Sequence, residues 1–480
     1  MQQSRLIQVL KSLESRDFRL FEEFVHSDYF NKNEKVRALC SYILQFKPDF
    51  ESSGLDKERA YECVYGSATY NRFQLNNLLS DLFQLLLFFL SVEQVRPQID
   101  VFQGALIQQL LTRDFDRFAE LELGKFEQAI EQQPFRNFTY FHQKYRLHEL
   151  ADRHFLRQAK RSKDPNLQEA SDALDRYYWT SKLRIASEMI SRNILLNAGY
   201  EPHFLDDLLA TNSAVVQVPA VKVYRKVVEL LLAPTEASVY FELKKELLAH
   251  STLFPPQELQ NLYGYALNFC IRQINFGHSA FYGEALDLYQ ALLERELLIQ
   301  DGYLSMWTFR NIVTTGIRTG AFEWTEQFIE TYQHDLQEQD RANAVQYNRA
   351  AYYYARKNYK AALQQLHDVE FTDNFYQIGA KTIQLKIYFE LMETEALFAL
   401  TTAFRKYLSR HRQLSDYHRQ SNQHFIKLSL QLYKLRSGKQ HWSKSIYQKR
   451  FGQLQEQLQE LSPVANLDWL REQWAILEGS

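Results

Sequence analysis

The sequence predicts an all-α fold, in which an N-terminal helical domain is followed by a series of stacked helical hairpins. The 480-residue chain holds only 15 Gly and 10 Pro, and no proline lies between Pro256 and Pro463, so a long stretch lacks the commonest helix breaker. Its 34 Phe and 29 Tyr recur at helical rather than alternating spacing, which indicates side chains that pack between helices. Two of them, Tyr353 and Tyr388, lie 35 positions apart, a period typical of stacked helix pairs.

Residues 1–96 are expected to form the N-terminal helical domain. Two short helices are indicated by apolar residues at spacings of three and four: Leu6, Val9, Leu10 and Leu13, then Phe18, Phe21 and Val25. Asn31 and Glu34 have the spacing of a capping box, which predicts that the next helix begins at Asn31, and a further helix is expected after Asp56.

The most apolar segment of the chain runs from Leu82 to Leu90. It is well short of the roughly 20 residues that a membrane-spanning helix needs, so the sequence predicts a buried helix there. Pro97 follows and marks the boundary of the domain.

Residues 97–256 are expected to form helical hairpins, because the prolines of this region fall between apolar periodic stretches. These prolines, which we predict to lie in turns, are Pro134, Pro165, Pro202, Pro219, Pro234, Pro255 and Pro256. The stretch from Leu174 through Ile190 has the pattern of an amphipathic helix.

The repeat is clearest within residues 257–440, and residues 441–480 are expected to form C-terminal capping helices. The segment 347–369 places a small residue one turn before an aromatic residue on a first helix, and a second helix follows a short turn at Lys357 and Asn358. This pattern resembles the tetratricopeptide repeat (TPR) family. In the resemblance, Ala350 and Ala362 take the small positions of the two helices, Tyr353 takes the aromatic position of the first, and Tyr359 is the turn aromatic.

The chain departs from the family at Gln346, where the family often has Trp, and at Val369, where it often has Ala. The matching turn positions of the neighbouring units are Phe322 and Thr394, which lie 37 residues before and 35 residues after Tyr359. Such unequal spacing predicts an α-solenoid of degenerate TPR-like hairpins.

Nearly the whole chain is also similar to an uncharacterised bacterial family of TPR-like helical proteins. The resemblance rests on Phe21–Phe24 with Ser27–Asn31, on Leu267–Asn275, and on Gly302–Trp307 with Arg310 and Asn311. It implies an architecture and brings no activity, substrate or functional residue.

No residue pattern indicates catalysis, a cofactor or a metal. His148-Glu149 is followed by His154 six positions later, where a zinc helix needs four, and Ser437-Gly438-Lys439 lacks the earlier glycine of a phosphate loop. Three cysteines (Cys40, Cys63 and Cys270) stand far apart, which is typical of reduced thiols in the cytoplasm. The N-terminus has no apolar signal core, which also favours a cytoplasmic protein.

Charge is unevenly distributed along the chain. Residues 405–450 contain twelve Lys or Arg and one acid, Asp416, so they carry a formal charge of +11. The chain as a whole carries −2, and the rest of the chain therefore carries −13. These cations are the candidate surface for an anionic partner: Arg405, Lys406, Arg410, Arg412, Arg419, Lys427, Lys434, Arg436, Lys439, Lys444, Lys449 and Arg450. On a single helix Arg419, Lys427 and Lys434 would form a stripe.

Aromatic residues interleave with these cations: Tyr407, Tyr417, Phe425, Tyr433, Trp442 and Tyr447. Two interpretations stay open. Bases of a nucleic acid could stack on exposed rings beside the cations. Alternatively, the rings pack inside the hairpins and the cations are solvated.

The first functional expectation is a non-catalytic scaffold or adaptor that binds a protein or peptide partner in the groove of stacked hairpins. The alternatives are a nucleic-acid-associated or ribosome-associated adaptor that uses residues 405–450, and an enzyme with an unrecognised site inside the solenoid. No membrane association is expected. The sequence does not identify the partner, the oligomeric state or the direction in which the cations face.

Overall fold

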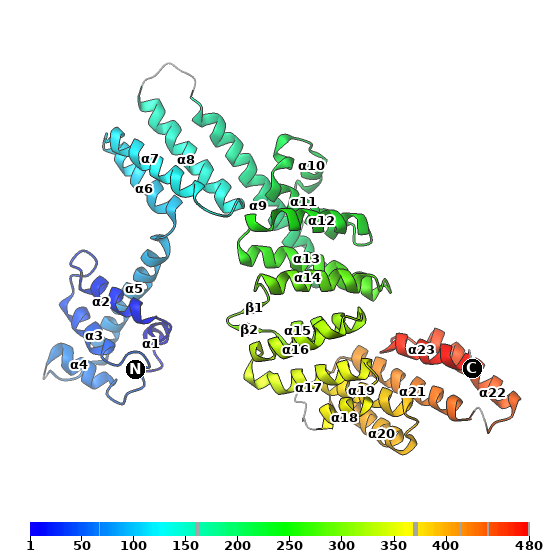
Figure 1. Cartoon of the computed structure of the whole chain (residues 1–480). Coiled ribbons are helices and arrows are strands. Elements are labelled where there is room, and N and C mark those ends of the chain that lie inside the picture. Colours follow the sequence, from blue (N-terminus) through cyan, green and yellow to red (C-terminus); the bar gives the residue numbers. More distant parts are fainter. Residues whose placement is uncertain are drawn as a thin grey trace. The chain divides into compact units, whose positions relative to one another are not determined.

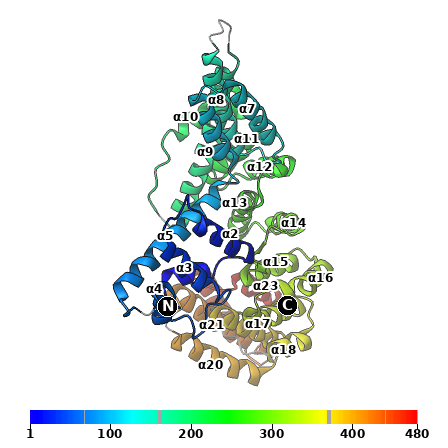
Figure 2. The same ribbon diagram turned by 90° about the vertical axis from the view of Figure 1, so that its left-hand side faces the viewer.

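The computed structural model describes residues 1–66, 68–158, 164–196, 198–367, 373–411, 414–438 and 441–478. In this part of the chain, 23 α-helices are joined by three short 3₁₀ helices and one pair of two-residue strands (Figures 1 and 2). The predicted all-α class is therefore confirmed. The chain divides into two compact units, residues 1–189 with 200–224 and residues 190–199 with 225–480.

The first unit is built from the helices of the N-terminal half, and α9 and α11 each continue into the second unit. Their bounds are α1 (Arg5–Leu10), α2 (Ser15–His26), α3 (Glu34–Leu44), α4 (Lys57–Tyr65), α5 (Arg72–Val95), α6 (Ile99–Thr112), α7 (Asp116–Glu131), α8 (Phe138–Arg157), α9 (Asn166–Leu196), α10 (Leu205–Ala210), the 3₁₀ helix η1 (Ala214–Gln217) and α11 (Pro219–Leu232). One core cluster joins α1–α5 and a smaller one joins α6–α8.

The start of α3 differs from the sequence prediction. Asn33, not Asn31, is the N-cap, and its side chain accepts a hydrogen bond from the Lys35 amide. Asn31 is buried two residues earlier, where its Nδ2 donates to the Val25 carbonyl and its Oδ1 accepts from the Asn33 amide. Asn31 therefore orders the loop before the helix, a role that competes with capping for short amide side chains. The start of α4 after Asp56 is confirmed, since Asp56 accepts hydrogen bonds from two amides of its first turn.

Helix α5 is longer than the apolar segment that predicted it. It spans 24 residues, and only 22% of its most apolar 18-residue window is buried. Five residues of one face, Leu75, Leu78, Leu82, Leu86 and Phe89, lie in the core, so the prediction of a buried helix holds for that face alone. By length and composition α5 is the one described helix that could cross a membrane.

The prolines of residues 97–256 lie at helix borders, although two of those predicted in turns begin helices. Pro134 separates α7 from α8, Pro165 precedes α9, and Pro219 and Pro256 are the first residues of α11 and α13. Proline suits the first turn of a helix because the amide that it lacks would have no partner there.

The second unit consists of consecutive helix pairs. Its elements are α12 (Ala237–His250), η2 (Ser251–Leu253), α13 (Pro256–Asn275), α14 (Phe281–Glu294), β1 (Ile299–Gln300), β2 (Tyr303–Leu304), α15 (Met306–Arg318), α16 (Phe322–Tyr332), η3 (Gln333–Asp335), α17 (Glu338–Ala355), α18 (Tyr359–His367), α19 (Asn374–Glu390), α20 (Thr394–Arg410), α21 (Asp416–Gly438), α22 (Lys444–Glu460) and α23 (Leu467–Glu478). Odd-numbered helices from α13 to α21 each contact the next helix along the chain, and α15, α17 and α19 also contact one another in sequence.

Three of these helix pairs share one turn. In each, the middle residue of a three-residue connection has a positive φ, and the next amide donates to the carbonyl five residues back. The middle residues and bonds are Gly320 with Ala321 N to Gly316 O (3.0 Å), Lys357 with Asn358 N to Tyr353 O (2.9 Å), and Met392 with Glu393 N to Tyr388 O (3.0 Å). This bond closes a helix C-terminus. The predicted turn positions Phe322, Tyr359 and Thr394 are the first residues of α16, α18 and α20.

The predicted small positions of the α17–α18 pair are confirmed as packing sites, since Ala350 and Ala362 are both fully buried. Val369 lies outside the described residues. The α15–α16 pair makes a similar approach with other residues: a Cβ added to Gly316 would lie 2.1 Å from Thr325 Oγ1.

Candidate ligand pocket in the second unit

A pocket of about 660 Å³ opens on the faces of α15, α17 and α19, and residues of α21 and α23 complete its wall. Its volume is in the range of small-molecule sites. Three cations line it, Arg310, Arg318 and Lys386, together with the carboxylate of Glu472. Among the described residues none of the three cations makes an ion pair, so their charge is available to a ligand.

Arg310 is held in place by aromatic rings of the neighbouring helices. Its guanidinium lies 5.0 Å from the ring centre of Tyr347 and 5.6 Å from that of Tyr376. Tyr376 is fully buried and its hydroxyl donates to the Met306 carbonyl at 3.0 Å. Because rigid rings support it, Arg310 loses less side-chain freedom on binding an anion.

A glycine allows the wall between α17 and α19 to form. A Cβ at Gly379 would lie 2.6 Å from Cε2 of Tyr347, too close for any side chain. The two helices therefore approach closely at the position where Tyr347 faces the pocket.

Lys386 is a half-buried lysine of α19 whose amine is held by a neutral partner. Its Nζ donates to Asn466 Oδ1 at 2.8 Å and lies 5.6 Å from the ring centre of Trp469. Burial, with the positive charge of Arg318 as the next cause, lowers the pKa of Lys386 to about 8. Glu472, Glu390 and Asp468 act in the opposite direction and do not compensate.

Glu390, one turn after Lys386, is occupied by other donors. Its carboxylate accepts from Trp469 Nε1 at 3.1 Å, from the Tyr354 hydroxyl at 2.5 Å and from the Tyr359 hydroxyl. Burial and this carboxylate raise the pKa of Tyr359 to about 12, so the phenol stays a donor at neutral pH. Glu390 thereby fastens α23 to α17 and α18, and its charge is shared among three donors.

None of the ten candidate cations of residues 405–450 that the structure describes lines this pocket. Arg405, Lys406 and Arg410 lie exposed on α20, Lys427 and Lys434 exposed on α21, and Lys444, Lys449 and Arg450 exposed on α22, whereas Arg412 and Lys439 lie outside the described residues. The expected stripe of Arg419, Lys427 and Lys434 does fall on a single helix.

Three of these cations are engaged within the fold. Arg419 is half-buried and pairs with Asp416 at 2.7 Å, Arg436 lies over the Phe389 ring, and Arg450 lies 4.1 Å from the centre of the Trp442 ring. The stripe on α21 therefore presents Lys427 and Lys434 as its free charges.

The interleaved aromatic residues mostly pack inward. Phe425 and Tyr433 are buried in the core cluster of α19–α23, and Tyr407, Trp442 and Tyr447 pack partly buried against it. Tyr417, with 64% of its surface exposed, is the ring of this group that could serve as a stacking platform. The packing interpretation thus accounts for most of these rings.

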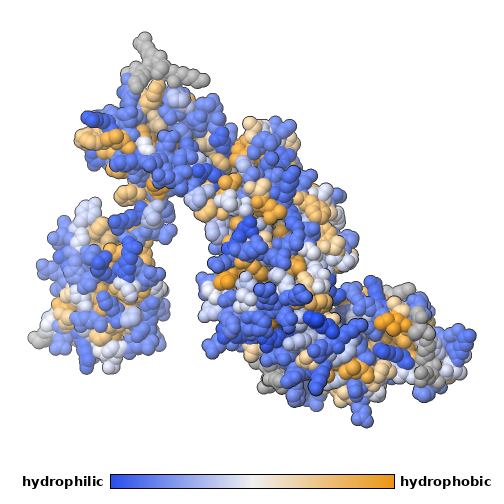
Figure 3. Space-filling view, in the orientation of Figure 1, coloured by the Kyte–Doolittle hydropathy of each residue, from blue (hydrophilic) through white to orange (hydrophobic). Residues whose placement is uncertain are grey.

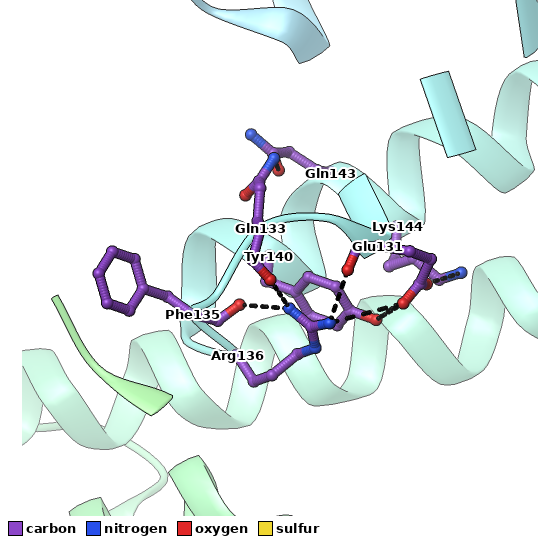
Figure 4. A network of polar contacts seen from close by, with 7 residues as sticks. All are labelled: Glu131, Gln133, Phe135, Arg136, Tyr140, Gln143 and Lys144. Atoms are coloured by element: carbon purple, nitrogen blue, oxygen red, sulfur yellow. Dashed lines mark hydrogen bonds and ion pairs between the residues drawn. The ribbon is translucent and has the colours of Figure 1, made fainter. Parts of the chain in front are cut away.

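In a second polar cluster, which lies in the first unit, the polar groups form hydrogen bonds and ion pairs with one another (Figure 4). Glu131 accepts from Lys144 Nζ at 2.9 Å and from the Tyr140 hydroxyl at 3.1 Å, and the Lys144 bond is the main cause that lowers the pKa of Glu131. Arg136 donates to the carbonyls of Phe135 and Glu131 and lies over the Tyr140 ring. With its charges paired among Glu131, Arg136 and Lys144, this cluster closes the α7–α8 connection.

The histidines of α8 that resembled a zinc helix have protein partners. His148 Nδ1 is 3.4 Å from Asn166 Oδ1, and His154 Nε2 is 3.3 Å from Gln158 Nε2. Within the described residues no three His, Cys, Asp or Glu side chains are grouped so that they could hold a metal ion.

Sequence reasoning did not find the pocket, because its charged residues come from three helices and are up to 162 positions apart, from Arg310 to Glu472. The one signal was indirect, since Arg310 belongs to the segment on which the resemblance to the bacterial family rests. Compared with known proteins, the chain matches no protein-family model, and neither the curated proteins nor the solved structures give a significant match.

Proposed function

We propose that this chain is a non-catalytic binding protein, in which the helix pairs of the second unit form a TPR-like α-solenoid and hold a protein or peptide partner on the faces of their first helices. The observation that carries the proposal is the pocket, because it is lined by the first helices of three consecutive pairs, α15, α17 and α19. A partner laid across these faces contacts several pairs at once, which is how helical repeats distribute binding energy.

The exposed surface of the first unit supports a role in protein binding. Apolar side chains gather at the α6–α7 end, visible as orange in Figure 3. Where α6 ends and α7 begins, Phe115 and Phe118 are about half exposed, and their ring centres lie 6.0 Å apart. Clustered exposed rings of this kind are typical of contact surfaces between proteins.

A matched pair of threonines tests the proposal. Thr314 is exposed on α15 and lines the pocket, whereas Thr402 is exposed on the second helix α20 and does not. The full chain would be used as bait in lysate of its native cell, with nuclease-treated and untreated arms. We expect Thr314→Trp to lose the protein partners that the wild-type chain and Thr402→Trp retain. Equal capture by both variants would contradict binding on the first-helix faces.

A second candidate function is binding of a nucleic acid by the cations of α20–α22. It is favoured by the exposed cations without an ion-pair partner among the described residues: Arg405, Lys406, Arg410, Lys427, Lys434, Lys444 and Lys449. Such binding must weaken steeply with salt, because phosphate contacts release counterions. Charge reversal of Lys427 and Lys434 should abolish it, and absence of binding to RNA and DNA at low salt would remove this candidate.

A further inference from the structure

Lys386 differs from the other cations of the pocket in its chemistry. An amine that keeps its proton is a cation like Arg310 or Arg318, but an amine that loses it is a nucleophile. Lys386 has no carboxylate partner to hold its proton, since its Nζ donates to the neutral amide of Asn466. With a pKa of about 8, roughly a quarter of the amine is neutral at pH 7.5, against about one part in a thousand for an ordinary lysine.

The surroundings of Lys386 are suited to a ligand that carries an anion. Arg310 and Arg318 line the same pocket, and both guanidinium groups are free of carboxylates among the described residues. A guanidinium binds a carboxylate or phosphate through two parallel hydrogen bonds. Trp469 and Phe375 also line the pocket, so apolar contact adjoins the charged groups.

We propose that this pocket is a covalent binding site for small carbonyl compounds bearing a carboxylate or phosphate, with Lys386 as the nucleophile that forms an imine and Arg310 and Arg318 as the groups that hold the anion. This site goes beyond the binding of a protein partner and does not depend on it.

The reaction balances without an oxidant or a reductant. The lone pair of the neutral Lys386 amine attacks the carbonyl carbon, and the electrons of the C=O bond move to oxygen. A proton passes from nitrogen to that oxygen, which gives a carbinolamine. A proton given to the carbinolamine hydroxyl lets it leave as water while the nitrogen lone pair forms the C=N bond. The protonated imine then carries one positive charge, equal to that of Lys386 before it lost its proton. Glu472 lines the same pocket and its charge acts on Lys386, so we assign its carboxylate to the exchange of these protons.

The chain offers a matched control on the same helix. Lys381 is also half-buried on α19, burial also lowers its pKa, and its Nζ lies 5.7 Å from the Tyr407 ring. It does not line the pocket, so it shares the burial of Lys386 but not the two arginines.

The experiment is imine trapping on the full chain. One arm uses 2-oxoglutarate and pyruvate as carboxylate probes and another uses pyridoxal 5′-phosphate, each with sodium cyanoborohydride, and a third uses benzaldehyde as an uncharged probe. Mass spectrometry of the digested protein measures the adduct on each lysine. We expect at least one anionic probe to modify Lys386 ten times faster than Lys381 or the exposed Lys427, and benzaldehyde to show no such preference.

Variants separate the groups of the site. Lys386→Arg should lose the adduct, Lys381→Arg should keep it, and Arg318→Gln should slow modification by an anionic probe about tenfold while leaving benzaldehyde unchanged. The rate on Lys386 should rise with pH and level off above about 8. The charged groups that face it are Arg318, Glu390, Asp468 and Glu472.

Three results would overturn the proposal: Lys386 modified no faster than Lys381 by either anionic arm, a preference for Lys386 that benzaldehyde shows equally, or no effect of Arg318→Gln on the anionic probes. Circular dichroism of each variant verifies its fold. Because the readout is a covalent adduct, failure here leaves the capture of protein partners untouched, and the two proposals can be judged separately.

Discussion

Replacement of Gly316 by alanine should weaken the second unit, because it forces a side chain into the closest approach between α15 and α16. The new Cβ would lie 2.1 Å from Thr325 Oγ1, where ordinary contacts lie at 3.4–4 Å, so one group must move by more than an ångström. Thr325 is fully buried and its hydroxyl donates to the Ala321 carbonyl at 2.7 Å, which opposes rotation of the side chain.

The expected magnitude follows from three contributions. Overpacking of a core costs about 1–3 kcal/mol. Loss of the Thr325 hydrogen bond costs about 1 kcal/mol. The greater helix propensity of alanine offsets about 1 kcal/mol. We therefore expect the free energy of unfolding to fall by about 2 kcal/mol.

The assay is urea denaturation followed by tryptophan fluorescence, which reports chiefly on the second unit because five of the six tryptophans lie there (Trp307, Trp324, Trp442, Trp469 and Trp474). Gly264→Ala is the control, because its Cβ meets nothing within 4 Å, and it should stabilise by about 0.5–1 kcal/mol. In the double variant Gly316→Ala/Thr325→Ala the clash is removed. Its loss in free energy of unfolding should therefore be smaller than the sum of the losses in the two single variants. A Gly316→Ala protein as stable as the Gly264→Ala protein would refute the reasoning.

Three further predictions concern charge. Lys386→Met should raise the free energy of unfolding at pH 7 by about 1–2 kcal/mol. The pKa of Lys386 is about 8 in the folded chain and 10.5 in the unfolded chain, so the unfolded chain binds more protons between these values and the Lys386 protein gains stability as pH rises. In denaturant titrations the advantage of Met should therefore vanish near pH 10. Glu390→Gln should lower the free energy of unfolding by about 2–3 kcal/mol, because the NH2 group of the new glutamine would face the donors of Trp469, Tyr354 and Tyr359. An unchanged urea midpoint would contradict this role of Glu390. If the chain binds single-stranded nucleic acid, replacing Lys427 and Lys434 by glutamine should reduce the steepness of log affinity against log salt by about 1.4. Fluorescence anisotropy measures this slope, and an unchanged slope would show that the phosphates bind elsewhere.

The sequence predicted the helices well where a single residue decides their borders. Prolines placed the ends of α7, α8, α11 and α13, because a missing amide cannot be compensated by neighbours. The prediction that α3 begins at Asn31 was wrong. Two asparagines stand close together, and only the three-dimensional path of the loop decides which one caps α3. Repeat positions 322, 359 and 394 were found from aromatic and small residues that the packing of one hairpin requires.

The pocket could not be predicted in this way. Lys386 is an ordinary lysine in a helical pattern, and its low pKa arises from burial and from the charge of Arg318, which are tertiary effects. The charge of residues 405–450 was evident from the sequence, but which cations stay free was not, because Arg419, Arg436 and Arg450 find partners within the fold.

The shared turn has a consequence for how such a chain can change length. The connection inside a helix pair is three residues in α15–α16, α17–α18 and α19–α20, and also in α6–α7 of the first unit, where Asp114 has the positive φ. The connections between pairs differ in length, since 11 residues join α14 to α15, five join α16 to α17 and six join α18 to α19. Because the length varies at the junctions and not at the shared turn, we expect the junctions to tolerate insertions and deletions, and a helix pair with its turn to be the unit that could be exchanged, duplicated or removed.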